Sequence, residues 1–280
     1  MEVNSVGVIG GGTMGSGIAQ VAAQAGLRVV LVDLAPDLLG RALGNIQKSL
    51  ERLEKKGSID ASKKQEALAR IATSTDIKQL RDQPFIIEAV FENLDLKKRI
   101  FKELDELCPP STILATNTSS LPVTEIAAMT RRPEKVIGTH FMNPVPVMMG
   151  VEVIRGRLTS DETVETTRNF IQRLGRKPIL AVDYAGFINS RLLNIYLNEA
   201  AYTVMDGNNP KDVDDCMVYT ANMSIGPCAL MDLVGIDVIV NILGILREEY
   251  GEKFKVAPLL RQMVRAGHLG RKTGRGFYQY

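Results

Sequence analysis

The sequence is poor in the residues that mark disulfide-rich and metal-stabilised proteins. Its 280 residues include three cysteines, Cys108, Cys216 and Cys228, and no CxxC or Cys/His spacing accompanies them. An odd number of cysteines argues against a disulfide framework, and the absence of these spacings argues against a structural zinc site. We therefore expect no metal, and we expect reduced thiols that serve as small core residues.

Neither an excess of charge nor a long apolar run is present. The 34 basic and 32 acidic residues leave a net charge of +2, which does not favour a general electrostatic grip on nucleic acid. The start, "MEVNSVGVIG", lacks a charged leader followed by a long apolar core, and no window has the apolar length that a bilayer requires. We expect a cytoplasmic protein with neither a nucleic acid nor a membrane as partner.

What the sequence does contain is an alternation of short β-branched runs with longer helical segments. This alternation predicts a Rossmann-type, doubly wound, mostly parallel α/β sheet. After residue 184 no further strand is indicated, so we predict a nucleotide-binding domain over 1–184 and a smaller all-helical domain over 185–280. The expected strands are 5–10, 28–33, 84–90, 112–117, 135–141, 151–154 and 177–182.

A glycine motif joins the first expected strand to the first expected helix. Gly10, Gly12 and Gly15 form G-x-G-x-x-G, with Thr13 and Met14 between the last two glycines. In this context the glycines permit a tight turn, a close approach of the backbone to a pyrophosphate, and close packing of helix on strand. A glycine-rich turn without a ligand is the alternative. We expect all five residues to contact a dinucleotide.

A second signal lies about 20 residues farther on, where Asp33 closes the run "RVVLVD". A carboxylate at this position accepts hydrogen bonds from the adenosine ribose and would repel a 2′-phosphate. The pair of signals therefore favours NAD over NADP. The alternative is an ordinary turn residue at the end of a strand.

The stretch "GTHFMNPVPVMMGVEVI" predicts a catalytic pair. His140 ends an expected strand of the nucleotide-binding sheet, where ligands bind in open α/β folds, and Glu152 lies in an apolar run where an unpaired carboxylate would be costly. If the loop between them folds back, the carboxylate fixes the imidazole tautomer and the other ring nitrogen can remove a proton. A histidine that merely ends a strand is the alternative.

Several long motifs, in the same order, resemble one enzyme family from end to end. The chain is similar to the 3-hydroxyacyl-CoA dehydrogenases, above all to the short bacterial 3-hydroxybutyryl-CoA dehydrogenases. The motifs are the glycine-rich start, "IIEAVFENLDLKK", "TNTSSLPVTEIA", "GTHFMNPVPVM", "VEVI" and "GRKTGRGFYQY". The resemblance implies NAD-dependent, reversible oxidation of an (S)-3-hydroxyacyl-CoA to the 3-ketoacyl-CoA, with 3-hydroxybutyryl-CoA or acetoacetyl-CoA as expected substrates, and a homodimer joined through the helical domain.

The resemblance also implies roles for single residues. His140 matches the general base, Glu152 the carboxylate that orients it, and Ser119 a hydroxyl that binds the reacting oxygen of the substrate. A helix cap is the alternative for Ser119. The residues matched to the nicotinamide half of the cofactor are Glu92, Lys97, Asn117 and Lys272. By spacing alone, Glu92 and Lys97 would be charges on a helix surface.

A helix is expected over 45–57, with an apolar stripe of Ile46, Leu50 and Leu53. In the family, residues that match Ser49 and Lys56 contact the nucleotide of coenzyme A. For the basic residues of this segment, a solvated helix face is the alternative.

The chain departs from the family pattern at Ser190, where an asparagine near the substrate is usual. Serine can still donate a hydrogen bond to the substrate, from a shorter reach, and Asn189 before it points about 100° away on a helix. Three rival interpretations stay open: a β-hydroxyacid dehydrogenase that acts on free acids, a non-catalytic NAD-binding protein of crystallin type, and a generic nucleotide-binding scaffold.

Overall fold

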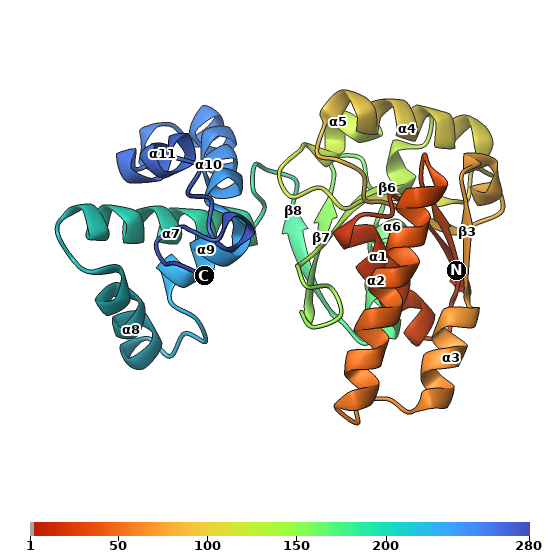
Figure 1. The fold of residues 1–280 in the computed structure, drawn as a ribbon. Helices are drawn as coiled ribbons and strands as arrows, with labels where there is room; N and C mark the ends of the chain where they lie inside the picture. Colours follow the sequence, from red (N-terminus) through yellow and green to blue (C-terminus); the bar gives the residue numbers. More distant parts are fainter. Residues whose placement is uncertain (1–2) are drawn as a thin grey trace. The chain divides into compact units, whose positions relative to one another are not determined.

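One eight-stranded sheet organises the first part of the chain, within the computed structural model that describes residues 3–280 (Figure 1). The strands run across the sheet in the order β3-β2-β1-β4-β5-β6-β7-β8. Their bounds are β1 Ser5–Ile9, β2 Arg28–Val32, β3 Ile71–Ser74, β4 Phe85–Glu88, β5 Ile113–Thr116, β6 Val136–Phe141, β7 Gly150–Arg155 and β8 Lys177–Val182.

The strands from β3 to β6 are parallel, β7 runs antiparallel to β6, and β8 is parallel to β7. The first six strands thus have the 3-2-1-4-5-6 order of the Rossmann fold. The reversal at β7 follows from chain length, because the eight residues between β6 and β7 are too few for a crossover connection to a parallel neighbour. The predicted mostly parallel, doubly wound sheet is confirmed.

Strand β3, with the sequence "IATS", was not expected. It has four residues, lies at an edge of the sheet, and is half-buried or exposed throughout. An edge strand of this kind needs no apolar run, because only one of its sides pairs with a neighbour. Its hydrogen bonds to β2, and not its own hydrophobicity, hold it in the sheet.

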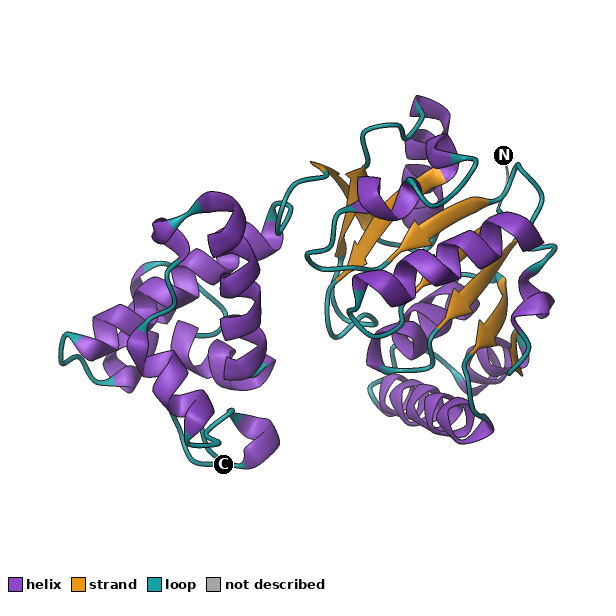
Figure 2. Ribbon diagram, turned by 90° about the horizontal axis from the view of Figure 1, so that it is seen from above, coloured by secondary structure: helices purple, strands orange, loops and turns teal. Residues whose placement is uncertain are grey.

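Helices cover both faces of the sheet (Figure 2). One apolar core joins side chains of α1, α2 and α6 with Phe85 and Ile87 of β4, and Phe85 stacks on Phe170 with ring centroids 4.5 Å apart. Ile86, buried between these two β4 residues, points to the opposite face. The helices of this unit are α1 Thr13–Gln24, α2 Pro36–Lys55, α3 Ala61–Ala69, α4 Leu94–Leu107, α5 Val123–Ala127 and α6 Asp161–Arg173.

Helix α2 carries the expected apolar stripe. Ile46 and Leu50 are fully buried in the core of the sheet unit, and Leu53 packs against that core from its edge. The helix begins earlier than expected, at Pro36, because proline is favoured in the first turn. It ends at Lys55, so Lys56 is the C-cap residue.

The chain divides into two units, Met1–Asp183 and Tyr184–Tyr280, and the second is helical. Its core contains buried side chains such as Leu197, Met231, Leu243 and Leu260. Its helices are α7 Asn189–Met205, α8 Pro210–Thr220, α9 Pro227–Val234, α10 Ile236–Tyr250 and α11 Pro258–Arg265. Within residues 3–280 no single helix meets the length and hydropathy of a membrane span, although the bent pair α9 and α10 does so together.

The C-terminal segment of this unit is held by two buried carboxylates. Asp232 accepts hydrogen bonds from the backbone N–H groups of Phe277 and Tyr278 at 2.9 Å and from the Tyr280 hydroxyl at 3.1 Å. Asp214 accepts the Tyr278 hydroxyl at 2.7 Å and two N–H groups at the start of α9. The motif "GFYQY" therefore closes the helical unit.

The expectation for the cysteines is wrong in one case. Cys108 and Cys228 are buried free thiols, as expected for core residues, but Cys216 is exposed on α8. Burial raises the pKa of Cys108 to about 11 and raises the pKa of Cys228 as well. The thiolate is the reactive form of cysteine. Burial therefore lowers the reactivity of both thiols in two ways, because it blocks access of reagents and keeps the sulfur protonated.

We predict that one thiol, that of Cys216, reacts rapidly with a chromogenic disulfide reagent in the native protein at pH 8. Cys108 and Cys228 should react only as the chain unfolds, so that guanidinium chloride raises the count from one to three. Replacing Cys216 by serine should abolish the rapid phase. Three rapid thiols in the native protein would contradict the burial described above.

Candidate active site and cofactor site

The glycine motif forms the turn between β1 and α1, and each glycine has its own steric reason. Gly10 has φ +102° and lies so close to β4 that a Cβ there would meet the Ala89 carbonyl oxygen at 2.6 Å. A Cβ on Gly15 would overlap the Gly10 carbonyl oxygen, so this glycine sets the distance between helix and strand. At Gly12 nothing lies within 4 Å of the Cβ position. The open side of the turn is therefore at Gly12.

This turn fits a pyrophosphate. Gly12 is exposed and is the N-cap of α1, which begins at Thr13 without a side-chain cap. The N–H groups of the first turn and the positive end of the helix dipole face the open side, which favours a bound anion. Thr13 is exposed at this end, whereas Met14 is half-buried and packs against the core of the sheet unit.

Asp33 lies beside the same turn. Its two carboxylate oxygens accept hydrogen bonds from the backbone N–H groups of Gly11 at 2.5 Å and Leu34 at 2.6 Å. Asp33 directly follows β2 at the carboxyl edge of the sheet. In this fold the adenosine ribose binds at that edge. A second negative charge, such as a 2′-phosphate, would be repelled here.

Three charged residues form a network between β4 and α4. The Lys97 ammonium lies 2.7 Å from Glu88 Oε1 and 3.4 Å from Glu92 Oε2, and the side chains of Lys97 and Glu88 are fully buried. Glu88 also accepts the Thr116 hydroxyl at 2.7 Å. The interpretation of Lys97 and Glu92 as charges on a helix surface is wrong. Lys97 points into the sheet, and Glu92 precedes α4.

Glu92 links this network to the loop after β5. Its Oε1 atom accepts hydrogen bonds from the Thr118 hydroxyl at 2.5 Å and from the Ser119 N–H at 3.0 Å. The helix-cap interpretation of Ser119 is wrong: the N–H groups at the start of α5 donate to Asp183, at 2.9 and 2.6 Å. Ser119 is thus a half-buried loop residue whose backbone is fixed by a carboxylate.

Asn117 connects this loop to the strand that carries His140. Its side-chain oxygen accepts the Phe141 N–H at 2.9 Å, and its own N–H donates to the Glu88 carbonyl at 2.7 Å. The ends of β4, β5 and β6 are therefore tied together at the carboxyl edge of the sheet.

His140 and Glu152 face each other across the antiparallel strands β6 and β7. The strand register pairs them directly, and His140 Nδ1 lies 2.7 Å from Glu152 Oε2. Both side chains are almost completely buried, at 7% and 3% exposure. An ionised carboxylate only accepts hydrogen bonds, so this contact places the ring proton on Nδ1 and leaves Nε2 as the basic nitrogen. The folded-back loop was correctly predicted.

The remaining expected site residues lie elsewhere. Ser49 is half-buried on α2 and Lys56 is exposed at its C-cap. Ser190 is buried in the first turn of α7, and Lys272 pairs with Asp237 at 2.5 Å within the helical unit. Ser190 and Lys272 both belong to the helical unit.

Sequence reasoning missed Glu88. Glu88 ends the buried run "PFIIE", just as Asp33 ends "RVVLVD", and this position was the one signal in the sequence. Only the burial of Lys97 beside it explains why a carboxylate lies there.

A glycine-rich turn between strand and helix, a carboxylate that follows β2 and a carboxylate-bound histidine lie on one sheet edge, an arrangement typical of an NAD-dependent dehydrogenase. Family models match both parts of the chain: the NAD binding domain of 3-hydroxyacyl-CoA dehydrogenase over residues 5–184 and the C-terminal domain over 186–280. The chain belongs to the 3-hydroxyacyl-CoA dehydrogenase family, and NAD is its cofactor.

Relatives cover the whole chain. A probable 3-hydroxybutyryl-CoA dehydrogenase of Bacillus subtilis is 44% identical over 282 residues, which is 100% of this chain and 98% of the relative. The crystal structure of (S)-3-hydroxybutyryl-CoA dehydrogenase PaaH1 from Ralstonia eutropha has a TM-score of 0.96 at 42% identity, with 100% and 99% of the two chains covered. That of FadB2 from M. tuberculosis has a TM-score of 0.98 at 40% identity over 100% of both.

We predict that alanine at Gly12 mainly weakens NADH binding, whereas alanine at Gly15 mainly lowers the stability of the fold. Gly12→Ala should weaken NADH binding more than tenfold by blocking the pyrophosphate, while it costs about 1 kcal/mol or less of stability as an N-cap change. Gly15→Ala should cost about 3 kcal/mol or more, because the overlapped backbone carbonyl cannot move aside. Urea unfolding and NADH fluorescence titration measure the two quantities. A stable Gly15→Ala or an NADH-tight Gly12→Ala would contradict the steric assignment.

Proposed function

We propose that this chain oxidises (S)-3-hydroxybutyryl-CoA reversibly to acetoacetyl-CoA, with His140 as the catalytic base. The observation that carries this proposal is the buried contact of 2.7 Å between His140 Nδ1 and Glu152 Oε2. The substrate is that named for the relatives from Bacillus subtilis and Ralstonia eutropha. Oxidation of a 3-hydroxyacyl-CoA needs a group that accepts the proton of the 3-hydroxyl. His140, held by Glu152, supplies this group.

In the oxidation, His140 Nε2 takes the proton of the 3-hydroxyl group while the C3–H bond breaks and the carbonyl forms. Bound NAD supplies the acceptor for the hydride, at C4 of its nicotinamide ring. Glu152 holds the imidazole in one tautomer and stabilises the imidazolium that results. In the reverse direction the imidazolium returns its proton to the forming alkoxide.

Neighbouring residues have supporting roles in this proposal. The Ser119 hydroxyl binds the reacting oxygen of the substrate, on a loop whose backbone Glu92 fixes at 3.0 Å. Glu92 and Asn117 lie at the same hydrogen-bonded edge and border the nicotinamide, with Lys272 of the helical unit as a further contact. Lys97 acts on the nicotinamide site through its ion pair with Glu92. Ser49 and Lys56 bind the nucleotide of coenzyme A, and Ser190 donates to the acyl part.

We also propose, from the family resemblance, a cytoplasmic homodimer joined through the helical unit. Light scattering of the full chain tests the oligomeric state, since a monomer of 30.7 kDa would contradict it.

We predict that His140→Ala lowers kcat for acetoacetyl-CoA reduction by about 10²- to 10⁴-fold, the usual contribution of a general acid or base. The dissociation constant for NADH should stay unchanged, because the dinucleotide turn is untouched. Steady-state kinetics and NADH titration measure the two effects. The chain offers a matched control in His268→Ala, which removes its second histidine from the helical unit and should leave kcat unaltered.

Two results would contradict the proposal. Near wild-type kcat in the His140→Ala protein would remove the histidine from the chemistry. Faster reduction of free acetoacetate than of acetoacetyl-CoA by the wild-type protein would favour a dehydrogenase of free hydroxy acids.

A further inference from the structure

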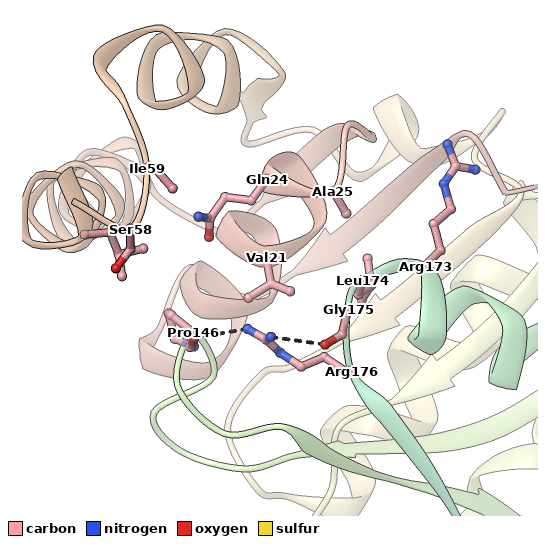
Figure 3. Close-up of a pocket in the computed structure, with 11 residues that line it drawn as sticks. Val21, Gln24, Ala25, Ser58, Ile59, Pro146, Arg173, Leu174, Gly175 and Arg176 are labelled. Atoms are coloured by element: carbon pink, nitrogen blue, oxygen red, sulfur yellow. Dashed lines mark hydrogen bonds between the residues drawn. The ribbon is translucent and has the colours of Figure 1, made fainter. Parts of the chain in front are cut away.

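Charged side chains fix loops of the sheet unit through hydrogen bonds to the backbone. Figure 3 shows one case, in which the Arg176 guanidinium points to Pro146 and donates to its carbonyl oxygen at 3.1 Å. The loop between β5 and α5, which carries Ser119, is another. There the charged groups are carboxylates, and they bind backbone N–H groups. This loop is therefore held by side chains from distant parts of the sequence.

The first half of this loop is held by Glu92. Its Oε1 atom accepts hydrogen bonds from the Ser119 N–H at 3.0 Å and from the Thr118 hydroxyl at 2.5 Å. The Thr118 oxygen in turn accepts the N–H groups of Ser120 at 3.3 Å and of Leu121 at 2.9 Å. The N–H groups of residues 119–121 thus all donate to side-chain oxygens.

The second half of the loop is held by Asp183. Its Oδ1 atom accepts the Val123 N–H at 2.9 Å, and its Oδ2 atom accepts the N–H of Thr124 at 2.6 Å and the hydroxyl of the same residue at 2.5 Å. Pro122 has no N–H group, and its ring fixes φ, here −65°. Each N–H group that the segment 119–124 contains is therefore bound, and little torsional freedom is left between Ser119 and the residues that Asp183 binds.

Asp183 is a firm anchor because its own backbone is tied to the sheet. It directly follows β8, and its N–H donates to the carbonyl oxygen of Arg155, the last residue of β7, at 3.2 Å. The Thr124 hydroxyl that donates to Asp183 also accepts the Arg157 N–H at 2.9 Å. The start of α5 is thus joined to the chain just beyond both strands.

A carboxylate suits this position better than a neutral amide does. Both of its oxygens are acceptors, and together they receive three donors from Val123 and Thr124. An asparagine would present its NH₂ group to some of these donors, and alanine would leave all three without this acceptor. Loss of the carboxylate therefore frees the second half of the loop.

We propose that Asp183 is a positioning residue for the reaction, which holds the Ser119 hydroxyl at the reacting oxygen of the substrate through the loop between them. The proposal rests on the role of Ser119 in the function proposed above. Placement of such a group matters because a displacement of about 1 Å can lower a rate about 10²-fold. Asp183 itself takes no part in proton or hydride transfer.

A double-mutant cycle on kcat for acetoacetyl-CoA reduction tests whether Asp183 acts through Ser119. Ser119→Ala should lower kcat about 10- to 100-fold, the effect of losing a hydrogen bond to an oxygen that gains charge. Asp183→Ala should lower kcat about 10-fold in the wild-type background and less than about 2-fold in the Ser119→Ala background, because residues that act as one unit are not additive.

The cycle separates the possible failures. An equal loss of kcat from Asp183→Ala in both backgrounds, or no loss in the wild-type background, would overturn the proposal and leave the proposed function intact. Wild-type kcat in Ser119→Ala would contradict the role of Ser119 in the proposed function, and the proposal with it. The dissociation constant for NADH should not change in either variant, because the glycine turn is untouched.

The matched control is Asp60→Ala, which removes the capping aspartate of α3. Asp60 is exposed and accepts the Lys63 N–H at 2.8 Å. Both alanine variants thus remove an aspartate that binds N–H groups at the start of a helix, and urea unfolding measures what each loses in stability. Asp60→Ala should keep the wild-type kcat. The same loss of kcat in Asp60→Ala as in Asp183→Ala would assign the effect to stability and overturn the proposal.

Should Asp183→Ala fail to fold, Thr124→Val removes one of the three donors and keeps the carboxylate. It should lower kcat about 3-fold, the effect of one hydrogen bond between uncharged and charged partners at some distance from the substrate. Thr124→Ser keeps the hydroxyl and should have the wild-type kcat. Equal kcat values in the valine and serine variants would overturn the proposal.

Amide hydrogen exchange of the full chain follows the loop without turnover. In Asp183→Ala, the N–H groups of Val123 and Thr124 lose their acceptor and should exchange faster. The Ser119 N–H keeps Glu92 as its acceptor, yet it should also exchange at least about 10-fold faster, because the freed loop opens more often. Faster exchange confined to residues 123 and 124 would overturn the proposal. Faster exchange at Ser119, in a protein whose wild-type form does not reduce acetoacetyl-CoA, would contradict the proposed function and leave the anchoring of Ser119 intact.

Discussion

The contact between His140 and Glu152 depends on the direction of one strand. Because β7 runs antiparallel to β6, the register places residue 152 directly opposite residue 140, and the two side chains meet at 2.7 Å inside the sheet unit. A parallel β7 would have needed a crossover helix in place of the short loop. The same reversal gives β8 its direction, because β8 runs parallel to β7.

Ionisable residues stand at the ends of three strands along the carboxyl edge of the sheet. Asp33 follows β2, Glu88 ends β4, and His140 lies near the end of β6. The glutamate fixes Lys97, and through Thr116 and the Asn117 backbone it ties β4 to β5. Buried ionic groups are tolerated here because each has hydrogen-bonding partners, and losing one partner would leave an uncompensated charge. Such a network orders the loops around a site more firmly than surface charges could.

The sequence predicted those parts in which local pattern and tertiary environment agree. Apolar runs gave seven of the strands, and the glycine spacing gave the turn to α1. Strand β3 escaped because its stability comes from β2. Spacing assigned Lys97 to a helix surface, since periodicity does not reveal a buried partner such as Glu88. Likewise, Asp183 caps α5 from 59 and 60 residues away, and no local rule detects so distant a cap for the helix next to Ser119.

Nitrogen NMR of ¹⁵N-histidine-labelled protein tests most directly whether Glu152 fixes the tautomer of His140. The chain has two histidines, so His268→Gln leaves a single ring to assign. In the neutral ring the account predicts a proton on Nδ1, lost from that position in Glu152→Ala. A neutral ring protonated on Nε2 in the protein with Glu152 intact would contradict it.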